Sequence, residues 1–213
     1  MNHKSDNLRL MLTPIIAVLG WFAIFLQLYL IIVNRVASVP ETIVRFFSFF
    51  TILTNILVAI CFSVIWIKPK NKWELFFLNN KTQTAITLYI LIVGIVYNLI
   101  LRLLWAPTGF QKVADELLHL VIPLLVFVYW IFITKKINLK FNDIFLWLIY
   151  PFVYLVLILI RGHFNGYYPY PFVDVIQLGY KTVFINTFFV ILAFLIVGIL
   201  LIGISKMKNK SNG

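Results

Sequence analysis

Charged side chains are scarce in this sequence, and acidic side chains are the scarcest. Only 12% of the 213 residues are charged, with seven Asp and Glu against 18 Lys and Arg, whereas 62% are hydrophobic. A mean hydropathy of +1.00 excludes a soluble domain of this size. The single cysteine, Cys61, excludes an internal disulfide. The sequence contains no glycine-rich nucleotide loop, no metal-ligand cluster and no serine-hydrolase elbow, so we predict neither a cofactor nor a metal site.

In place of charge the sequence has six long apolar windows. Every charged residue falls outside them, and each window is long enough to cross the hydrocarbon core of a bilayer as a helix. The windows are Leu10–Asn34, Phe46–Ile67, Thr82–Leu101, Leu117–Thr134, Ile144–Ile160 and Thr182–Ser205. We therefore predict an all-α fold, a single bundle of six transmembrane helices. The expected spans are 10–34, 46–67, 82–104, 115–134, 143–160 and 182–205, between tails 1–9 and 206–213.

The basic residues are distributed unequally between the two sides of the membrane. Twelve of the 18 Lys and Arg lie in the two tails and in the loops after the second and fourth windows, and six lie on the other side. By the positive-inside bias, both termini are predicted to be cytoplasmic. Topology thus accounts for the net charge of +11, and we expect no nucleic-acid partner.

Polar side chains recur along one face of the second predicted helix. Their spacings of three, three and four residues place them on a single helical face, which should turn away from lipid towards other helices or a cavity. They are Arg45, Ser48, Thr51 and Asn55, with Thr54 one step round the helix. A structural alternative is that the hydroxyl groups bond to carbonyls of their own helix.

One histidine falls inside a predicted span, and two acids precede it by one turn. A carboxylate of Asp115 or Glu116 can orient the His119 imidazole and stabilise its charged form, as a general base requires. An ionisable group in a membrane helix is a functional candidate by default, although a hydrogen-bonded structural histidine is the alternative. Pro123, four residues further on, should free the His119 carbonyl from its helical partner.

Further polar residues lie at the same predicted depth. Asn98 is a candidate oxyanion donor, because an amide can stabilise developing negative charge. The arginines could hold a lipid carboxylate through paired guanidinium bonds, although arginines near helix ends also commonly reach to the membrane surface. They are Arg45, Arg102 and Arg161.

The loop after the fifth window is long, aromatic and rich in proline. Residues that precede proline are pushed towards extended geometry, so this segment should be stiff and non-helical. We predict that it forms a lid over the outer ends of the second to fourth helices. The lid segment consists of Tyr168, Pro169, Tyr170, Pro171 and Phe172.

Three stretches carry a resemblance to a known family. They are FFTILTNILV (Phe49–Val58), LLHLVIPLL (Leu117–Leu125) and RGHFNGYYPYPFVDV (Arg161–Val175). With them the chain resembles bacterial six-pass membrane proteins related to the androgen-induced and androgen-dependent integral membrane proteins of animals, which are threonine hydrolases of fatty acid esters of hydroxy fatty acids. The resemblance implies a bacterial plasma-membrane protein with Thr51 as nucleophile and His119 as base. Thr54 is close enough in the motif to be a rival.

Two functions remain open from the sequence. The first is a threonine-dependent hydrolase of lipid esters acting in the outer leaflet, with membrane lipids and a small lipid ester as its partners. The second is a non-enzymatic lipid- or solute-binding membrane protein, or a transporter, that uses the same polar cavity; no internal repeat supports alternating access. The sequence makes no prediction about oligomeric state.

Overall fold

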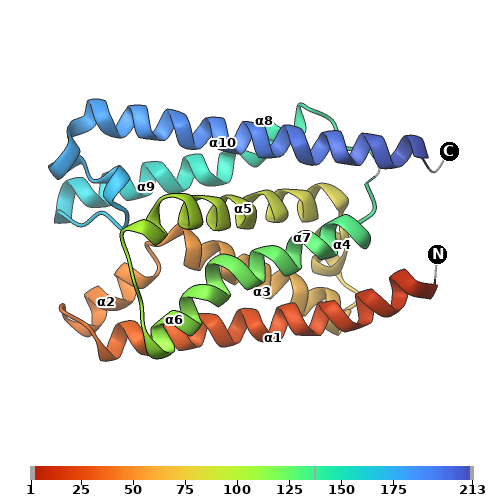
Figure 1. The fold of residues 1–213 in the computed structure, drawn as a ribbon, viewed down its shortest axis with the longest axis horizontal. Helices are drawn as coiled ribbons and strands as arrows, with labels where there is room; N and C mark the ends of the chain where they lie inside the picture. The colour runs from red at the N-terminus through yellow and green to blue at the C-terminus, as the bar shows by residue number, and fades with distance from the viewer. Residues whose placement is uncertain (1–2, 137, 212–213) are drawn as a thin grey trace.

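The structure is a computed structural model that describes residues 3–136 and 138–211, and its regular elements are all helices within those ranges. Six of these helices are long and apolar enough to cross a membrane. This confirms the predicted all-helical fold with six candidate spans, the architecture of a multi-pass membrane protein. Both ends of the chain lie at the same end of the bundle (Figure 1). We call this the terminal end, and the opposite end the distal end.

Ten α-helices and three short helical turns follow one another along the described chain. They are α1 (His3–Val33), α2 (Val39–Phe46), α3 (Phe50–Ile67), α4 (Lys72–Leu78), α5 (Asn80–Leu99), η1 (Leu101–Leu103), α6 (Gly109–Glu116), η2 (Leu117–Val121), α7 (Ile122–Phe132), α8 (Asp143–Trp147), α9 (Ile149–Asn165), η3 (Pro171–Val173) and α10 (Val175–Ser211). In Figure 1, α9 and α10 form a layer along one side of α5, while α1 and α3 lie on its other side.

Close backbone approaches hold α1, α3, α5 and η2 together. A Cβ on Gly20 of α1 would lie 3.1 Å from the Cβ of Ala59 on α3. A Cβ on Gly94 of α5 would lie 3.2 Å from the His119 carbonyl oxygen and 3.3 Å from Pro123. Only glycine allows these helices to pack at such short range, which brings the segment around His119 against α5.

The second predicted helix is broken, which corrects the expected span 46–67. Helix α2 ends at Phe46 and α3 begins at Phe50, so Arg45 and Thr51 belong to different helices. Two tyrosines satisfy the backbone groups that the break frees: Tyr154 donates to the Ser48 carbonyl at 2.8 Å, and the Thr51 N–H donates to the Tyr170 hydroxyl at 3.2 Å. Irregular backbone at membrane depth is tolerated where protein groups satisfy it in this way.

Other helix ends differ from the prediction by several residues. Helix α9 continues to Asn165, beyond the predicted 160, and ends where Gly166 adopts a left-handed φ of 69°. Helix α10 begins at Val175 and is kinked at Gly179, where φ is 73°. The fourth span begins at Gly109 in α6 and contains a π-helical turn, η2, before it ends at Phe132. Prolonged helices at the distal end shorten the loop that carries the lid segment.

Candidate functional site

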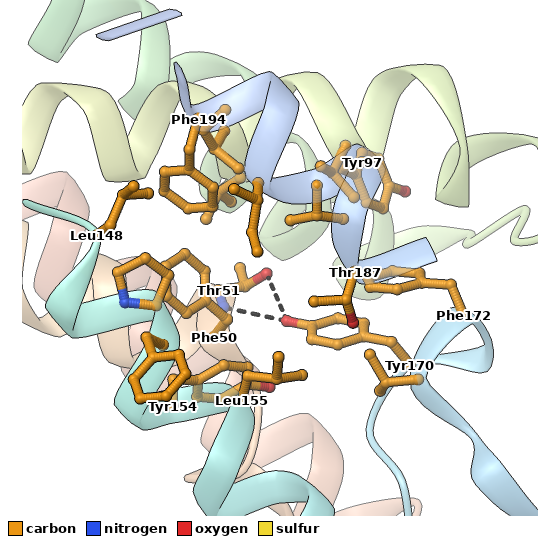
Figure 2. A pocket seen from close by; sticks show the side chains of 18 of the residues that line it. Phe50, Thr51, Tyr97, Leu148, Tyr154, Leu155, Tyr170, Phe172, Thr187 and Phe194 are labelled. Carbon is orange, nitrogen blue, oxygen red and sulfur yellow. Dashed lines mark hydrogen bonds between the residues drawn. The ribbon is translucent and has the colours of Figure 1, made fainter. Parts of the chain in front are cut away.

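A cavity of about 340 Å³ lies among α3, α5, α9, α10 and the lid segment. Its walls are largely apolar, and the exceptions are hydroxyl groups. These belong to Thr51, Tyr97, Tyr154, Tyr170 and Thr187. Figure 2 shows the Thr51 and Tyr170 side chains meeting inside this cavity. Its volume lies at the low end of the range for small-molecule sites, about 300–1,000 Å³.

Thr51 presents its hydroxyl to the cavity from the first turn of α3. Its Oγ1 lies 3.3 Å from the Tyr170 hydroxyl, which also accepts the Thr51 backbone N–H. Either hydroxyl can donate in the Thr51–Tyr170 hydrogen bond. Burial raises the pKa of Tyr170, so its phenol stays neutral at physiological pH. The nucleophile candidate is therefore positioned by a residue of the lid segment.

Thr54 and Asn55, the polar residues that follow Thr51 on the predicted face, point elsewhere. The Thr54 hydroxyl lies 3.3 Å from the Tyr150 hydroxyl and does not line the cavity. The Asn55 amide donates to the Thr51 carbonyl at 2.9 Å and to the Leu118 carbonyl at 3.3 Å. Asn55 thus links the turn that carries Thr51 to the turn that carries His119. Of the two rival threonines, Thr51 is the one that borders the cavity.

His119 lies in the π-helical turn η2 and is held by Asp115. Its Nδ1 is 2.9 Å from the Asp115 carbonyl oxygen and 3.3 Å from Asp115 Oδ1. Tyr97 donates a hydrogen bond to the same carboxylate, and its ring stacks on the imidazole with centroids 3.8 Å apart. An Nδ1–H directed at Asp115 leaves Nε2 as the basic nitrogen, and Nε2 has no hydrogen-bond partner among the described residues.

Asn98, Glu116 and Arg102 have partners that differ from the predicted roles. The Asn98 amide donates to the Gly94 carbonyl at 2.8 Å and to the His119 carbonyl at 3.1 Å, so both of its hydrogens are in use. The His119 carbonyl is the one that Pro123 was predicted to free, and Asn98 satisfies it. Arg102 pairs with Glu116 at 2.7 Å. In this arrangement Asn98 supports the π turn and has no hydrogen left for an oxyanion.

Arg45 and Arg161 share one carboxylate at the distal end. Arg45 Nε and Arg161 Nη2 lie 2.8 and 2.9 Å from the same Glu41 oxygen, and both guanidinium groups lie over the Tyr167 ring. Arg161 also donates to the Ser48 hydroxyl. The Arg45 hydrogen bond is the main reason why the pKa of Glu41 lies below its ordinary value. Two cations and one anion leave an excess positive charge here.

The lid segment packs against α3, which is the second span, as expected, but it also packs against α9 and α10 of the fifth and sixth spans. The Tyr168 ring lies so close to Gly162 that any Cβ at this position would clash with it, and Pro169 is buried. The Tyr170 ring stacks on Phe172 at 5.2 Å. Pro171 and Phe172, the last two residues of the segment, lie in the 3₁₀ turn η3, so this part is helical and not non-helical as predicted. The lid segment therefore closes the distal end of the cavity with an ordered set of rings.

The structure brings some predicted site residues together and keeps others apart. Thr51 and His119 are both at the distal half of the bundle, but no hydrogen bond joins them in the described part of the chain, and His119 does not line the cavity. Tyr97 relates the two residues, since it lines the same cavity as Thr51 and its ring stacks on the His119 imidazole. Tyr97, Tyr150 and Tyr154 were not predicted as site residues. A tyrosine in an apolar window is expected only to pack against its neighbours, and the partners of these hydroxyl groups are distant in the sequence.

Comparisons with protein-family models, with curated proteins and with solved structures find no match to this chain.

Proposed function

We propose that the protein is an integral membrane hydrolase of lipid (fatty acid) esters with Thr51 as its nucleophile. The observation that carries the proposal is the Thr51 hydroxyl at the polar end of an otherwise apolar cavity. An ester with a long hydrocarbon chain matches such a site, because its carbonyl needs polar partners and its chain needs an apolar wall. The resemblance of the FFTILTNILV and LLHLVIPLL stretches to threonine hydrolases points to the same two residues, Thr51 and His119.

In the proposed reaction the Thr51 Oγ bonds to the acyl carbon and the ester C–O bond breaks. The Thr51 proton passes to His119, which returns it to the departing alcohol, and water then releases the fatty acid from Thr51. Asp115 holds the imidazole with Nε2 free to accept that proton. In this structure the Thr51 hydroxyl is hydrogen-bonded to Tyr170. The reaction therefore requires this hydrogen bond to break and Thr51 to approach His119 when substrate binds.

Arg45 and Arg161 support an anionic substrate group at the distal end. Their excess positive charge over Glu41 favours a carboxylate or another acidic lipid group near the distal end of the cavity. Arg102 is paired with Glu116 on the other side of Tyr97 and is a weaker candidate.

The proposal is tested by the purified protein in detergent micelles with a fluorophosphonate probe and a panel of fatty acid esters. We expect the probe to modify Thr51, and Thr51→Val and His119→Ala each to lower hydrolysis by about 10²–10⁴-fold. Thr51→Ser should retain much of the rate. The double variant should lose little more than either single variant, because members of one catalytic unit are not additive.

Thr13→Val is the matched control for these variants. It also removes a buried hydroxyl from a membrane helix, but that hydroxyl donates to the Arg9 carbonyl of its own helix and does not line the cavity. Its rate should match the unmodified protein. Full activity in Thr51→Val with loss in Thr54→Val would transfer the nucleophile to Thr54.

A second candidate is a non-enzymatic lipid-binding protein or transporter. The absence of a hydrogen bond between the described Thr51 and His119 favours it, because a resting nucleophile and base usually lie within reach of each other. Binding of a fatty acid or ester without turnover, and without probe labelling of any residue, would establish this candidate and reject the hydrolase.

We further propose that both termini are cytoplasmic, from the unequal distribution of basic residues. Single cysteines at Ser38 and Ser211, in a Cys61→Ser background, test this in intact cells. An impermeant thiol reagent should label position 38 and spare position 211. The reverse pattern would place the termini outside.

A further inference from the structure

We propose that the cavity is an open-ended channel for one long acyl chain, whose tail passes into the bilayer between the middle parts of α9 and α10. This inference rests on the proposed function in one respect, which is that the ester carbonyl of the substrate lies at Thr51. The inference adds the path of the chain, the side from which it enters and the way chain length is selected.

The cavity is elongated along the membrane-spanning direction. At the distal end it is bounded by Thr51, Tyr170 and Phe172, and towards the terminal end it reaches Leu148 and Phe145. Phe145 in α8 and Leu155 in α9 are ten positions apart in the sequence, which corresponds to about 15 Å at the helical rise per residue. An extended hydrocarbon chain fits such a shape better than a compact solute does.

Helix α10 contacts the segment formed by α8 and α9 at two places, one near each end of the cavity. At the distal end Ile158, Val173 and Val183 form a small buried cluster. At the terminal end α10 is in contact with α8, where a Cβ on Gly198 would lie 3.3 Å from Ile144. The cavity lies in the interval between these two contacts. Such an interval forms a window in the side of the bundle.

The residues at the rim of this window face both the cavity and the bilayer. Ile149 and Phe152 of α9 and Ile191 of α10 line the cavity, yet they are 54%, 64% and 41% exposed. A residue that lines an internal space and is also half exposed marks the opening of that space. The opening lies on the lipid-facing surface, so a membrane lipid has direct access and a water-soluble ligand does not.

The distribution of polar groups fixes the direction of the chain. Thr187 Oγ1 is buried without a hydrogen-bond partner among the described residues, and Figure 2 shows Thr187 beside Tyr170. A buried hydroxyl without a partner is costly, and an ester carbonyl would accept its proton. The window is lined by apolar side chains alone. The carbonyl therefore lies at the distal end and the methyl end at the window.

An open window has a consequence for selectivity. A closed pocket measures chain length, because a chain that is too long cannot enter. Here the surplus carbons of a long chain extend into the bilayer, so the rate should rise with chain length until the channel is filled and then stay constant. Ile191→Trp should close the window and convert this plateau into a cut-off.

Ile191→Trp is compared with Ile196→Trp, which adds the same ring to an exposed isoleucine of α10 that does not line the cavity. We expect Ile191→Trp to lower kcat/KM for the longest esters by about tenfold or more, with short esters hydrolysed normally. Ile196→Trp should keep the plateau. Equal profiles for the two variants would overturn the channel while leaving the hydrolase intact.

A second measurement does not need catalysis. Thr51→Val in vesicles is irradiated with a long-chain fatty acid that carries a diazirine at its methyl end, with and without excess unlabelled fatty acid. Competed labelling should fall on Ile149, Phe152 or Ile191. Labelling at other helices, or labelling that the competitor does not reduce, would overturn the channel. Competed labelling at these residues in a protein that hydrolyses no ester would reject the hydrolase and uphold the channel.

Discussion

The two halves of the bundle differ in how closely their helices approach. In the half built from α3 and α5, 56% of each membrane-spanning window is buried, whereas the value is 22% for α9 and α10. Glycines bring α1 to α3 and α5 to η2, but tyrosine and phenylalanine rings separate α9 from its neighbours. Tight packing fixes the Asp115–His119 pair, and loose packing leaves space for a ligand. The proposed site lies where the two halves meet.

The largest expected effect tests the packed half. Gly94→Leu should lower the free energy of unfolding by about 3 kcal/mol, the upper part of the range for overpacked cores. The reason is that the new Cβ would meet the His119 carbonyl, a backbone atom held by Asn98, at 3.2 Å. Thermal unfolding in detergent, followed by tryptophan fluorescence, measures the loss.

Gly203→Leu is the matched control for Gly94→Leu. Gly203 lies in α10 with no atom within 4 Å of an added Cβ, so the same substitution should leave the unfolding temperature almost unchanged. Equal losses in the two variants would mean that packing does not distinguish the halves.

A smaller effect is expected at the joint between the halves. Tyr154→Phe removes the hydroxyl that satisfies the Ser48 carbonyl at the break between α2 and α3. A buried carbonyl without a partner costs about 1–3 kcal/mol, so the variant should unfold at a lower temperature. Tyr29→Phe, at an exposed tyrosine of α1, is the control. A Tyr154→Phe protein as stable as this control would show that the break does not depend on Tyr154.

The positions of the spans could be predicted because hydropathy depends on composition within each window. The break at 47–49 could not, since Arg45 to Asn55 fit a helical face and the groups that stabilise the break, Tyr154 and Tyr170, are more than 100 residues away. Pro123 is an intermediate case. The sequence predicted that it frees the His119 carbonyl, and the structure adds Asn98 as the group that satisfies it.

The candidate site was predictable in its residue types and less so in its contacts. Polar residues in apolar windows drew attention to Thr51 and His119, because such residues are costly in a membrane. Their partners depend on how helices pack. Thr51 bonds to Tyr170, and His119 bonds to Asp115. Of these two pairs, sequence spacing could predict only Asp115 and His119, because they are one turn apart in the sequence.

The smallest expected effect concerns a second joint, at Glu41. This carboxylate of α2 binds Arg45 of the same helix and Arg161 of α9, so it ties the two halves at the distal end. Its pKa in the folded protein lies below the ordinary value of 4.5, which means that folding favours the ionised form. The stabilisation is therefore present above the ordinary pKa and is lost as the pH falls through the folded-state pKa.

Glu41→Gln should accordingly lower the unfolding temperature slightly at neutral pH, and the difference from the unmodified protein should shrink on acidification below about pH 4.5. Added salt should reduce it as well, because the ion pairs are partly exposed. Glu74→Gln serves as the control, since Glu74 forms no ion pair among the described residues and accepts a backbone N–H that glutamine can also accept. A difference in unfolding temperature that grows on acidification would mean that Glu41 does not join the halves through its charge. The contact between α2 and α9 would then depend on the Arg161–Ser48 hydrogen bond and the Tyr167 ring.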